Sequence, residues 1–275
     1  MTMRTIKHIL IPLAVFLALS GAGHARGSLA VAVDSTSGDF IDAGHAQARL
    51  SASLVVDGEP VVGADVVWTV SSAANHSAAM PAGRNENTAG LAWTTAVRGN
   101  AAPIPELTTA TDGSGSATAV LTDIIGERSV LVRATALSGG RSYSAEREVV
   151  FGKGPLSVFA APLPEPVSWL ELYGICNGRA YGGDPSQWVI GQGFEGGDKL
   201  PTMEHIQAVS LPGKYNKHPA AMGAAVAAGW PEDRRYWKGR VVMKMRAGHV
   251  NIRDGNPHGS GGQLVGNKEY GVCLR

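Results

Sequence analysis

The 275-residue chain is poor in cysteine, aromatic residues and charge, with two cysteines, 6% aromatic and 17% charged residues. Two cysteines and eight scattered histidines do not supply the four clustered ligands of a structural zinc site. The formal net charge of +1 gives no basic stripe of the kind that binds nucleic acid. After residue 25, no apolar run approaches the ~20 residues that span a bilayer. We therefore expect no metal, no cofactor, no nucleic-acid partner and no transmembrane segment.

The first 25 residues have the three parts of a secretory signal peptide. Arg4 and Lys7 give a positive start, and Ile9–Leu19 is an apolar run that is too short to span a membrane. Gly23 and Ala25 are small residues suited to cleavage, and no lipoprotein cysteine follows them. We expect an exported protein that is secreted, periplasmic or associated with the cell surface, and that begins near Arg26.

The two cysteines, Cys176 and Cys273, both lie in the C-terminal part of the chain. In an exported protein, an even pair of cysteines is most simply a disulfide. In the chain-entropy model, closing a loop of roughly 100 residues contributes up to about 4.7 kcal/mol. The sequence therefore predicts a disulfide that braces this part of the molecule.

Composition divides the chain in two. Acidic residues outnumber basic ones between residues 26 and 165, whereas the balance reverses afterwards, and most of the tryptophans and tyrosines lie in the second part. A stretch rich in proline and glycine lies between them and is typical of a linker. We expect a first domain at 26–152, a linker at 153–166 and a second domain at 167–275.

The first domain shows the alternation of β-strands and no helical period. The expected strands are Ser28–Val33, Ala46–Val56, Val61–Val70, Ala117–Thr122, Ser129–Ala136 and Ser142–Phe151, with a turn at Asp57 and Gly58. Short strands of this number indicate a β-sandwich, with Trp68 in its core. The polar stretch Ser71–Leu107 has no period, and we favour a mobile loop there over a functional one.

Two motifs of the first domain are more specific. They are DGEPVVGADVVWTVSS at 57–72 and TTATDGSGSATAVLTD at 108–123. Together they resemble the bacterial immunoglobulin-like repeats (Big-1 type) of the intimin and invasin adhesins, over most of residues 45–137. The resemblance implies an Ig-like sandwich.

The second domain mixes helical and strand patterns and many glycines. Helices are expected at Thr202–Leu211 and Pro219–Ala228, and strands at Trp188–Ile190, Val241–Met245, His249–Ile252 and Tyr270–Leu274. The sequence therefore predicts a small α+β domain. The order of Cys176, LPTMEHIQAV, GWPEDRRYW and the ending EYGVCLR resembles the C-type lectin-like domain that caps the same adhesins. The resemblance implies that Trp230 and Trp237 fill the core and do not form a ligand platform.

Several functional motifs are excluded. The acidic residue, proline and asparagine of a calcium-dependent sugar site are missing, since Asn256-Pro257-His258 has no carboxylate. Gly191–Gly196 fits a dinucleotide-binding glycine pattern, yet no helix opens at its third glycine. The acid–base candidates follow no known catalytic spacing; they are Glu195, Asp198, Glu204, His205, His218, His249 and His258. We therefore expect no enzyme.

The favoured interpretation is a non-catalytic, adhesin-like protein that presents a C-type lectin-like tip to a protein on a host or bacterial surface. The loops 214–218, 231–238 and 254–262 are expected to gather away from the first domain. They predict a mildly basic face for an acidic partner, composed of Tyr215, Lys217, Arg234, Arg235, Tyr236 and Lys238. Two alternatives stay open: an enzyme of the formylglycine-generating, lectin-like fold group, or a periplasmic carrier or subunit of a surface assembly.

Overall fold

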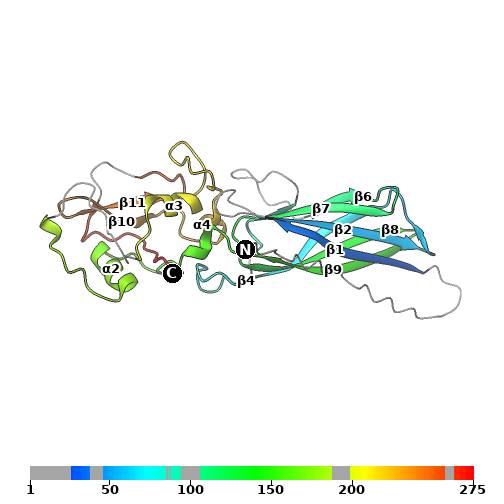
Figure 1. Ribbon diagram of the computed structural model, residues 1–275, viewed down its shortest axis with the longest axis horizontal. Helices are drawn as coiled ribbons and strands as arrows, with labels where there is room; N and C mark the ends of the chain where they lie inside the picture. Colours follow the sequence, from blue (N-terminus) through cyan, green and yellow to red (C-terminus); the bar gives the residue numbers. More distant parts are fainter. Residues whose placement is uncertain are drawn as a thin grey trace, which may run out of the picture.

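The computed structural model describes residues 26–37, 46–84, 86, 88–93, 106–187, 199–257 and 263–275. The expected signal peptide and the expected strand at 188–190 lie outside these residues. A β-sandwich and a smaller part of mixed helices and strands lie end to end along the long axis (Figure 1). None of the helices in the described residues is long and apolar enough to cross a membrane.

The sandwich consists of two antiparallel sheets. The first has the order β1-β2-β7-β5, with β3 paired to β2, and the second has the order β6-β4-β8-β9. The strands of the first sheet are β1 (Gly27–Ser37), β2 (Ala46–Val56), β3 (Glu59–Pro60), β5 (Leu91–Trp93) and β7 (Ser116–Asp123). Those of the second are β4 (Asp65–Asn75), β6 (Glu106–Ala110), β8 (Arg128–Ser138) and β9 (Arg141–Phe151).

Alternating side chains build the sandwich core. In β2, every second side chain from Ala46 to Leu54 is buried, and the side chains between them face outward. Because side chains of a strand alternate between its two faces, the inward rows of both sheets meet in one hydrophobic cluster. Trp68 is fully buried in that cluster, 6.1 Å from the ring of Trp93, and its indole donates to the Thr109 hydroxyl at 2.8 Å.

The stretch 71–107, expected to be mobile, is packed in most of its described portion. β4 continues through Asn75, and β5 pairs with β7 at the edge of the first sheet. Between these strands, Ala79 and Met80 are buried against residues of the smaller part. The expectation of mobility is therefore wrong here, because these residues form an edge strand and one side of the junction.

The smaller, α+β part is arranged around a sheet of order β10-β11-β12. Its elements are the 3-10 helices η1 (Pro155–Val158) and η2 (Pro185–Gln187), the helices α2 (Trp169–Asn177), α3 (Met203–Val209) and α4 (Ala224–Ala227), and the strands β10 (Arg235–Met243), β11 (Arg246–Asn251) and β12 (Gln263–Leu264). The expected helix at 219–228 forms only as α4. The expected strand at 270–274 forms only isolated bridges, from Tyr270 to Tyr236 and from Leu274 to Phe159.

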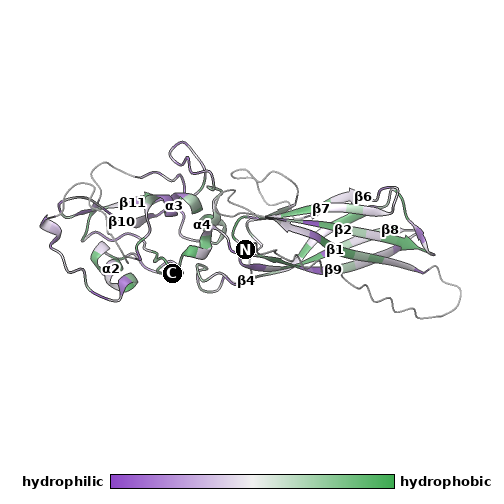
Figure 2. Cartoon of the chain, in the orientation of Figure 1, coloured by the Kyte–Doolittle hydropathy of each residue, from purple (hydrophilic) through white to green (hydrophobic). Residues whose placement is uncertain are grey.

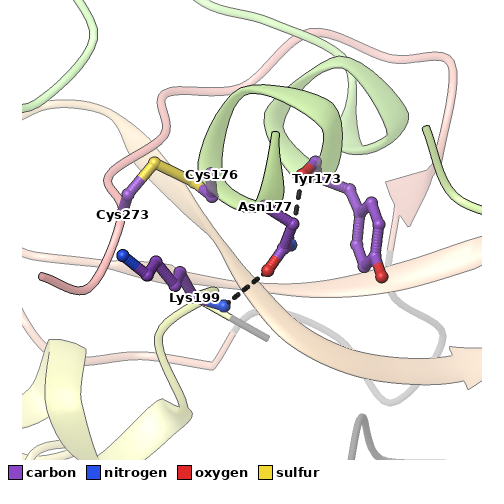
Figure 3. Close-up of a disulfide and its surroundings, with 5 residues drawn as sticks. All are labelled: Tyr173, Cys176, Asn177, Lys199 and Cys273. Atoms are coloured by element: carbon purple, nitrogen blue, oxygen red, sulfur yellow. Dashed lines mark hydrogen bonds between the residues drawn. A yellow bond between two sulfur atoms is a disulfide. The ribbon is translucent and has the colours of Figure 1, made fainter. Parts of the chain in front are cut away.

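A disulfide joins Cys176, in the last turn of α2, to Cys273, with the two Cα atoms 5.2 Å apart (Figure 3). Asn177, the next residue, donates to the Tyr173 carbonyl at 3.1 Å and accepts from the Lys199 amide at 2.9 Å (Figure 3). The end of α2 is thereby tied both to the C-terminus and to the chain that leads into α3.

The two parts share a hydrophobic core at their junction. The sandwich contributes Ala79 and Met80, and also Ile124 and Ile125 from the turn between β7 and β8. These side chains join a cluster of the α+β part that includes Leu156, Phe159, Ile206, Val250 and Trp230. The larger hydrophobic cluster of the α+β part therefore includes residues of the sandwich, separate from the sandwich's own core.

The backbone of the junction is closely packed as well. The buried Asp123 carboxylate accepts hydrogen bonds from the amides of Ile125 and Gly126 and pairs with the buried Arg128, which fixes the turn after β7. A Cβ atom on Gly154 would lie only 2.0 Å from the carbonyl oxygen of Ile125, so the chain that leaves the sandwich fits against this turn only as glycine. The stretch 153–166, expected as a linker, is thus docked onto the sandwich at its start.

Candidate binding surface

Three loops of the α+β part lie next to one another and form the candidate binding surface, called the three-loop face below. They are residues 211–218, 231–234 and 252–257. The Leu211 amide donates to the Ile252 carbonyl at 3.0 Å, which joins the first loop to the third. Arg253 pairs with Asp233 at 3.0 Å, which joins the third loop to the second. The described portions of the loops predicted at 214–218, 231–238 and 254–262 therefore lie next to one another, while residues 258–262 of the third lie outside the described residues.

Side-chain amides fix the shape of this face. Asn216 is buried, donates to the carbonyls of Gln207 and Leu211 at 2.8 and 2.9 Å, and accepts from the His218 amide at 3.1 Å. The Gln207 amide donates to the Gly255 carbonyl at 2.9 Å. Gly255 has a φ of +64°, and a Cβ atom there would lie 2.3 Å from Asn216, so only glycine fits. The first and third loops are held by this network as one rigid surface.

An exposed aromatic ring with a cation beside it stands on the first loop. Tyr215 is 47% exposed, and the Lys214 ammonium lies 5.2 Å from its ring centroid, in the range of a cation–π contact. Lys217 and Arg234 are exposed too. Within the described part of the chain, neither Lys217 nor Arg234 forms an ion pair with a carboxylate. The face therefore presents an amphipathic ring together with cations that are available to an outside carboxylate.

Arg235 stands at the edge of this face. It is half-buried and lies 3.8 Å from Glu269, whose pKa is raised by burial and lowered in part by Arg235 and Arg234. Arg235 is thus only partly accessible to a partner, and the Glu269 carboxylate already lies near its guanidinium.

The expectation that Tyr236 and Lys238 lie on the face is wrong. Both belong to β10, which begins at Arg235, so the loop ends at Arg234, four residues earlier than the sequence predicts. Tyr236 is fully buried and stacks on Trp230 with 5.6 Å between the rings; burial, and then Tyr270, raise the pKa of its phenol. Lys238 is 8% exposed and its alkyl chain fills the space over Gly248; burial, and then Arg240, lower the pKa of its ammonium.

The tryptophans that frame the second loop are structural. Trp230 is 2% exposed, and its indole donates at 2.9 Å to the carbonyl of Ala79 in the sandwich. Trp237 is fully buried, and its indole donates at 2.8 Å to the carbonyl of Val167. Neither ring is available as a platform for a ligand.

The three-loop face does not lie at the far end of the molecule, which corrects a further expectation. The second loop follows Trp230, and Trp230 touches the sandwich, so this loop begins at the junction. The far end is formed instead by the chain that follows α2 and by the turn between β10 and β11 (Figure 1). These two segments are linked by a hydrogen bond from the Met245 amide to the Pro185 carbonyl at 2.9 Å. The face lies on the flank of the α+β part.

The acid–base candidates within the described residues have structural roles. His205 follows the N-cap of α3 and its Nδ1 accepts from the Thr202 amide at 3.2 Å; burial lowers the pKa of its ring, an effect that Glu204 opposes. His218 accepts from the Ala220 amide, and His249 is buried edge-on against Trp237. Glu195, Asp198, His258 and the glycines 191–196 lie outside the described residues. Among the residues described, no three His, Cys, Asp or Glu side chains are grouped to hold a metal.

Comparison with known proteins leaves the family open. No family model matches the sequence, and no curated protein is significantly similar to it. Among solved structures, the chain is similar to the adhesin InvE of Yersinia pseudotuberculosis, with 17% sequence identity, 91% of this chain and 71% of that chain covered, and a TM-score of 0.36. Similarity at this level establishes neither a family nor a shared fold.

Proposed function

We propose that the chain is an exported, non-catalytic, adhesin-like protein that binds an acidic protein on a host or bacterial surface through the three-loop face. In this proposal the sandwich is an Ig-like spacer, the α+β part is a C-type lectin-like recognition domain, and the signal peptide directs export. Binding needs neither calcium nor another cofactor.

The observation that carries the proposal is the rigid exposure of Tyr215 with unpaired cations around it. Tyrosine and arginine are enriched at the energetic centres of protein interfaces, because they combine apolar area with hydrogen-bonding capacity. Since the buried amide of Asn216 already fixes this loop, a partner does not have to order it, and the entropic cost of binding is reduced. Exposed lysine and arginine beside the ring favour carboxylates on the partner.

The rigid junction supports the same proposal. Because Ala79, Met80, Ile124 and Ile125 of the sandwich are packed into the larger hydrophobic cluster of the α+β part, a partner that contacts the three-loop face is held at a fixed orientation to the sandwich. If the sandwich is held in place at a surface, a recognition domain packed rigidly against it has a fixed orientation relative to that surface. Three of the acid–base candidates are engaged in structural contacts, His205 at a helix cap, His218 with the Ala220 amide and His249 in the core, which favours binding over catalysis.

The test is saturable binding of the fluorescently labelled protein to intact cells, measured by flow cytometry. Replacing Tyr215 by alanine should weaken binding by about thirtyfold, the scale of an interface hot spot. Replacing both Lys217 and Arg234 by alanine should weaken it less and should reduce its dependence on salt.

The matched control removes two exposed cations of the sandwich, Arg49 and Arg147, by the same change to alanine. It should bind as the parent protein does. All variants should keep their thermal stability, since exposed charges contribute little to folding. If the Tyr215 variant and the control bind equally well, the three-loop face is not the binding site.

A further inference from the structure

A second surface with binding character lies on the outer side of α2. It is a groove of about 640 Å³ that is lined by the helix and by the residues just beyond its ends. Residues three and four apart share one side of a helix, so Leu170, Gly174 and Gly178 form one row along the groove, and Glu171 and Ile175 form the next. In Figure 1, α2 lies in the half of the α+β part that is remote from the sandwich.

The groove has aliphatic walls that face solvent. Leu170 is 38% and Ile175 is 53% exposed, whereas the opposite side of the same helix, with Trp169, Leu172 and Cys176, is buried. Isolated exposed apolar residues are ordinary on a protein surface. Here, however, the two residues line the same groove, and Val167 extends the apolar lining beyond the start of the helix.

Gly174 keeps the floor of the groove open. A Cβ atom at this position would meet only the Arg179 carbonyl oxygen, at 3.9 Å, so no packing constraint demands glycine there. Glycine inside a helix is destabilising relative to alanine. The sequence thus forgoes helix stability at a position that lines the groove, where a large side chain would occupy it.

The two charges of the groove are not equivalent. The Glu171 carboxylate accepts from the Ser168 amide at 2.7 Å in the capping box of α2, and this hydrogen bond lowers its pKa. Arg179 is exposed at the other end of the groove. Among the described residues, it forms no ion pair. The groove therefore combines an apolar floor with one cation that is free to bind an anion.

We propose that this groove binds an aliphatic side chain of a protein partner, with a carboxylate next to it on the same chain. The aliphatic side chain lies over Gly174 between Leu170 and Ile175, and the carboxylate pairs with Arg179. A protein segment fits better than a free small molecule, because the groove is open along the helix and cannot enclose a ligand. This inference goes beyond the three-loop face and does not depend on it.

The smallest probe that carries both groups is N-acetyl-leucine with its free carboxylate. Titration into the purified chain, followed by NMR, should shift the backbone resonances of residues 170–179 with a dissociation constant in the millimolar range. N-acetyl-leucine amide, which lacks the carboxylate, should bind about threefold more weakly, as expected for one solvent-exposed charge pair. Arg179→Gln should remove this difference between the two probes.

Gly174 offers a matched pair of variants. Gly174→Phe should fill the groove and abolish the shifts, while Gly174→Ala should fold at least as well as the parent and keep them, because alanine leaves the groove open. The proposal is overturned if neither probe perturbs residues 170–179, if the perturbed residues lie elsewhere, or if Gly174→Phe binds as the parent does. Tyr215→Ala should bind the probe normally, so failure of the three-loop face in cell binding leaves this result unaffected.

Discussion

The buried side chains of the sandwich and those of the α+β part are organised differently. Among the residues that the structure describes, the sandwich core is one cluster that runs from Ala46 to Phe151 and draws on no residue outside the sandwich. The α+β part has two clusters, and the larger of them includes Ala79, Met80, Ile124 and Ile125 of the sandwich. The smaller cluster contains Cys176 of the disulfide, with Cys273 packed against it.

Element length explains this difference. The strands of the sandwich reach 11 residues and pair along most of their length, whereas the described α-helices of the α+β part, α2, α3 and α4, have nine, seven and four residues. Helices this short are not stable alone in water, because few hydrogen bonds repay the cost of nucleation. The part that carries the proposed binding surfaces therefore depends on a disulfide and on its neighbour for stability.

The largest effect is expected from removing the disulfide. Replacing both Cys176 and Cys273 by serine should lower the free energy of unfolding of the α+β part by about 2–5 kcal/mol, because the unfolded chain is no longer constrained. Hydrogen exchange measured by mass spectrometry should show faster exchange in α2 and β11. Equal loss of protection in β2 and β8 would contradict the separation of the two cores.

A smaller effect is expected from Trp230→Phe, which removes the indole donor to the Ala79 carbonyl. The change should cost about 1–3 kcal/mol, since a buried acceptor loses its partner. Exchange should rise on both sides of the junction, in residues 76–84 and in α4.

The control for this variant is Trp237→Phe, whose indole donates within the α+β part, to Val167. It should cost a similar amount but leave residues 76–84 protected. If both variants affect the same regions, the junction is not specifically held by Trp230.

The smallest effect concerns pH. Burial lowers the pKa of His205 below its ordinary value of 6.5, so the unfolded state binds the proton more readily than the folded state. Stability from this residue is present above pH 6.5 and is lost as the pH falls from there through the folded pKa. His205→Gln should reduce the loss of melting temperature between pH 7 and pH 5, in comparison with the parent protein. If the melting temperature of the variant fell as much as that of the parent protein, His205 would not be the cause of the pH dependence.

The sequence predicts the sandwich better than the α+β part, for a physical reason. The alternation of apolar and polar residues in Ala46–Val56 is a repeated local signal. It identifies the strand, the face that is buried and the side chains that enter the core. By contrast, α2 was not predicted from the sequence. The only local signal for its start is the capping box of Ser168 and Glu171, and the helix has just nine residues. Short helices give too few turns for a period to stand out.

The candidate binding surface, too, could be predicted only where a local sequence pattern determines exposure. The exposure of Lys217 and Arg234 could be identified from the sequence, since unpaired burial of charge is costly, and Tyr215 could be identified with them because it lies in the same loop as Lys217. The burial of Tyr236 and Lys238 depends on where β10 begins and on the open space over Gly248, neither of which local pattern determines. The groove on α2 was missed as well, although Gly174 between Leu170 and Ile175 is a readable signal once the helix is known.

The central claim is that the sandwich completes the core of the α+β part and thereby fixes its binding surfaces. It is tested most directly by comparing two fragments, 26–152 and oxidised 153–275, by NMR. The account predicts that 26–152 gives a dispersed spectrum and unfolds cooperatively. The fragment 153–275 should have poorly dispersed resonances, because Trp230 and Phe159 then lack Ala79, Met80, Ile124 and Ile125 as neighbours. The central claim would be contradicted if 153–275 alone gave a dispersed spectrum and melted at the same temperature as the α+β part of the full chain.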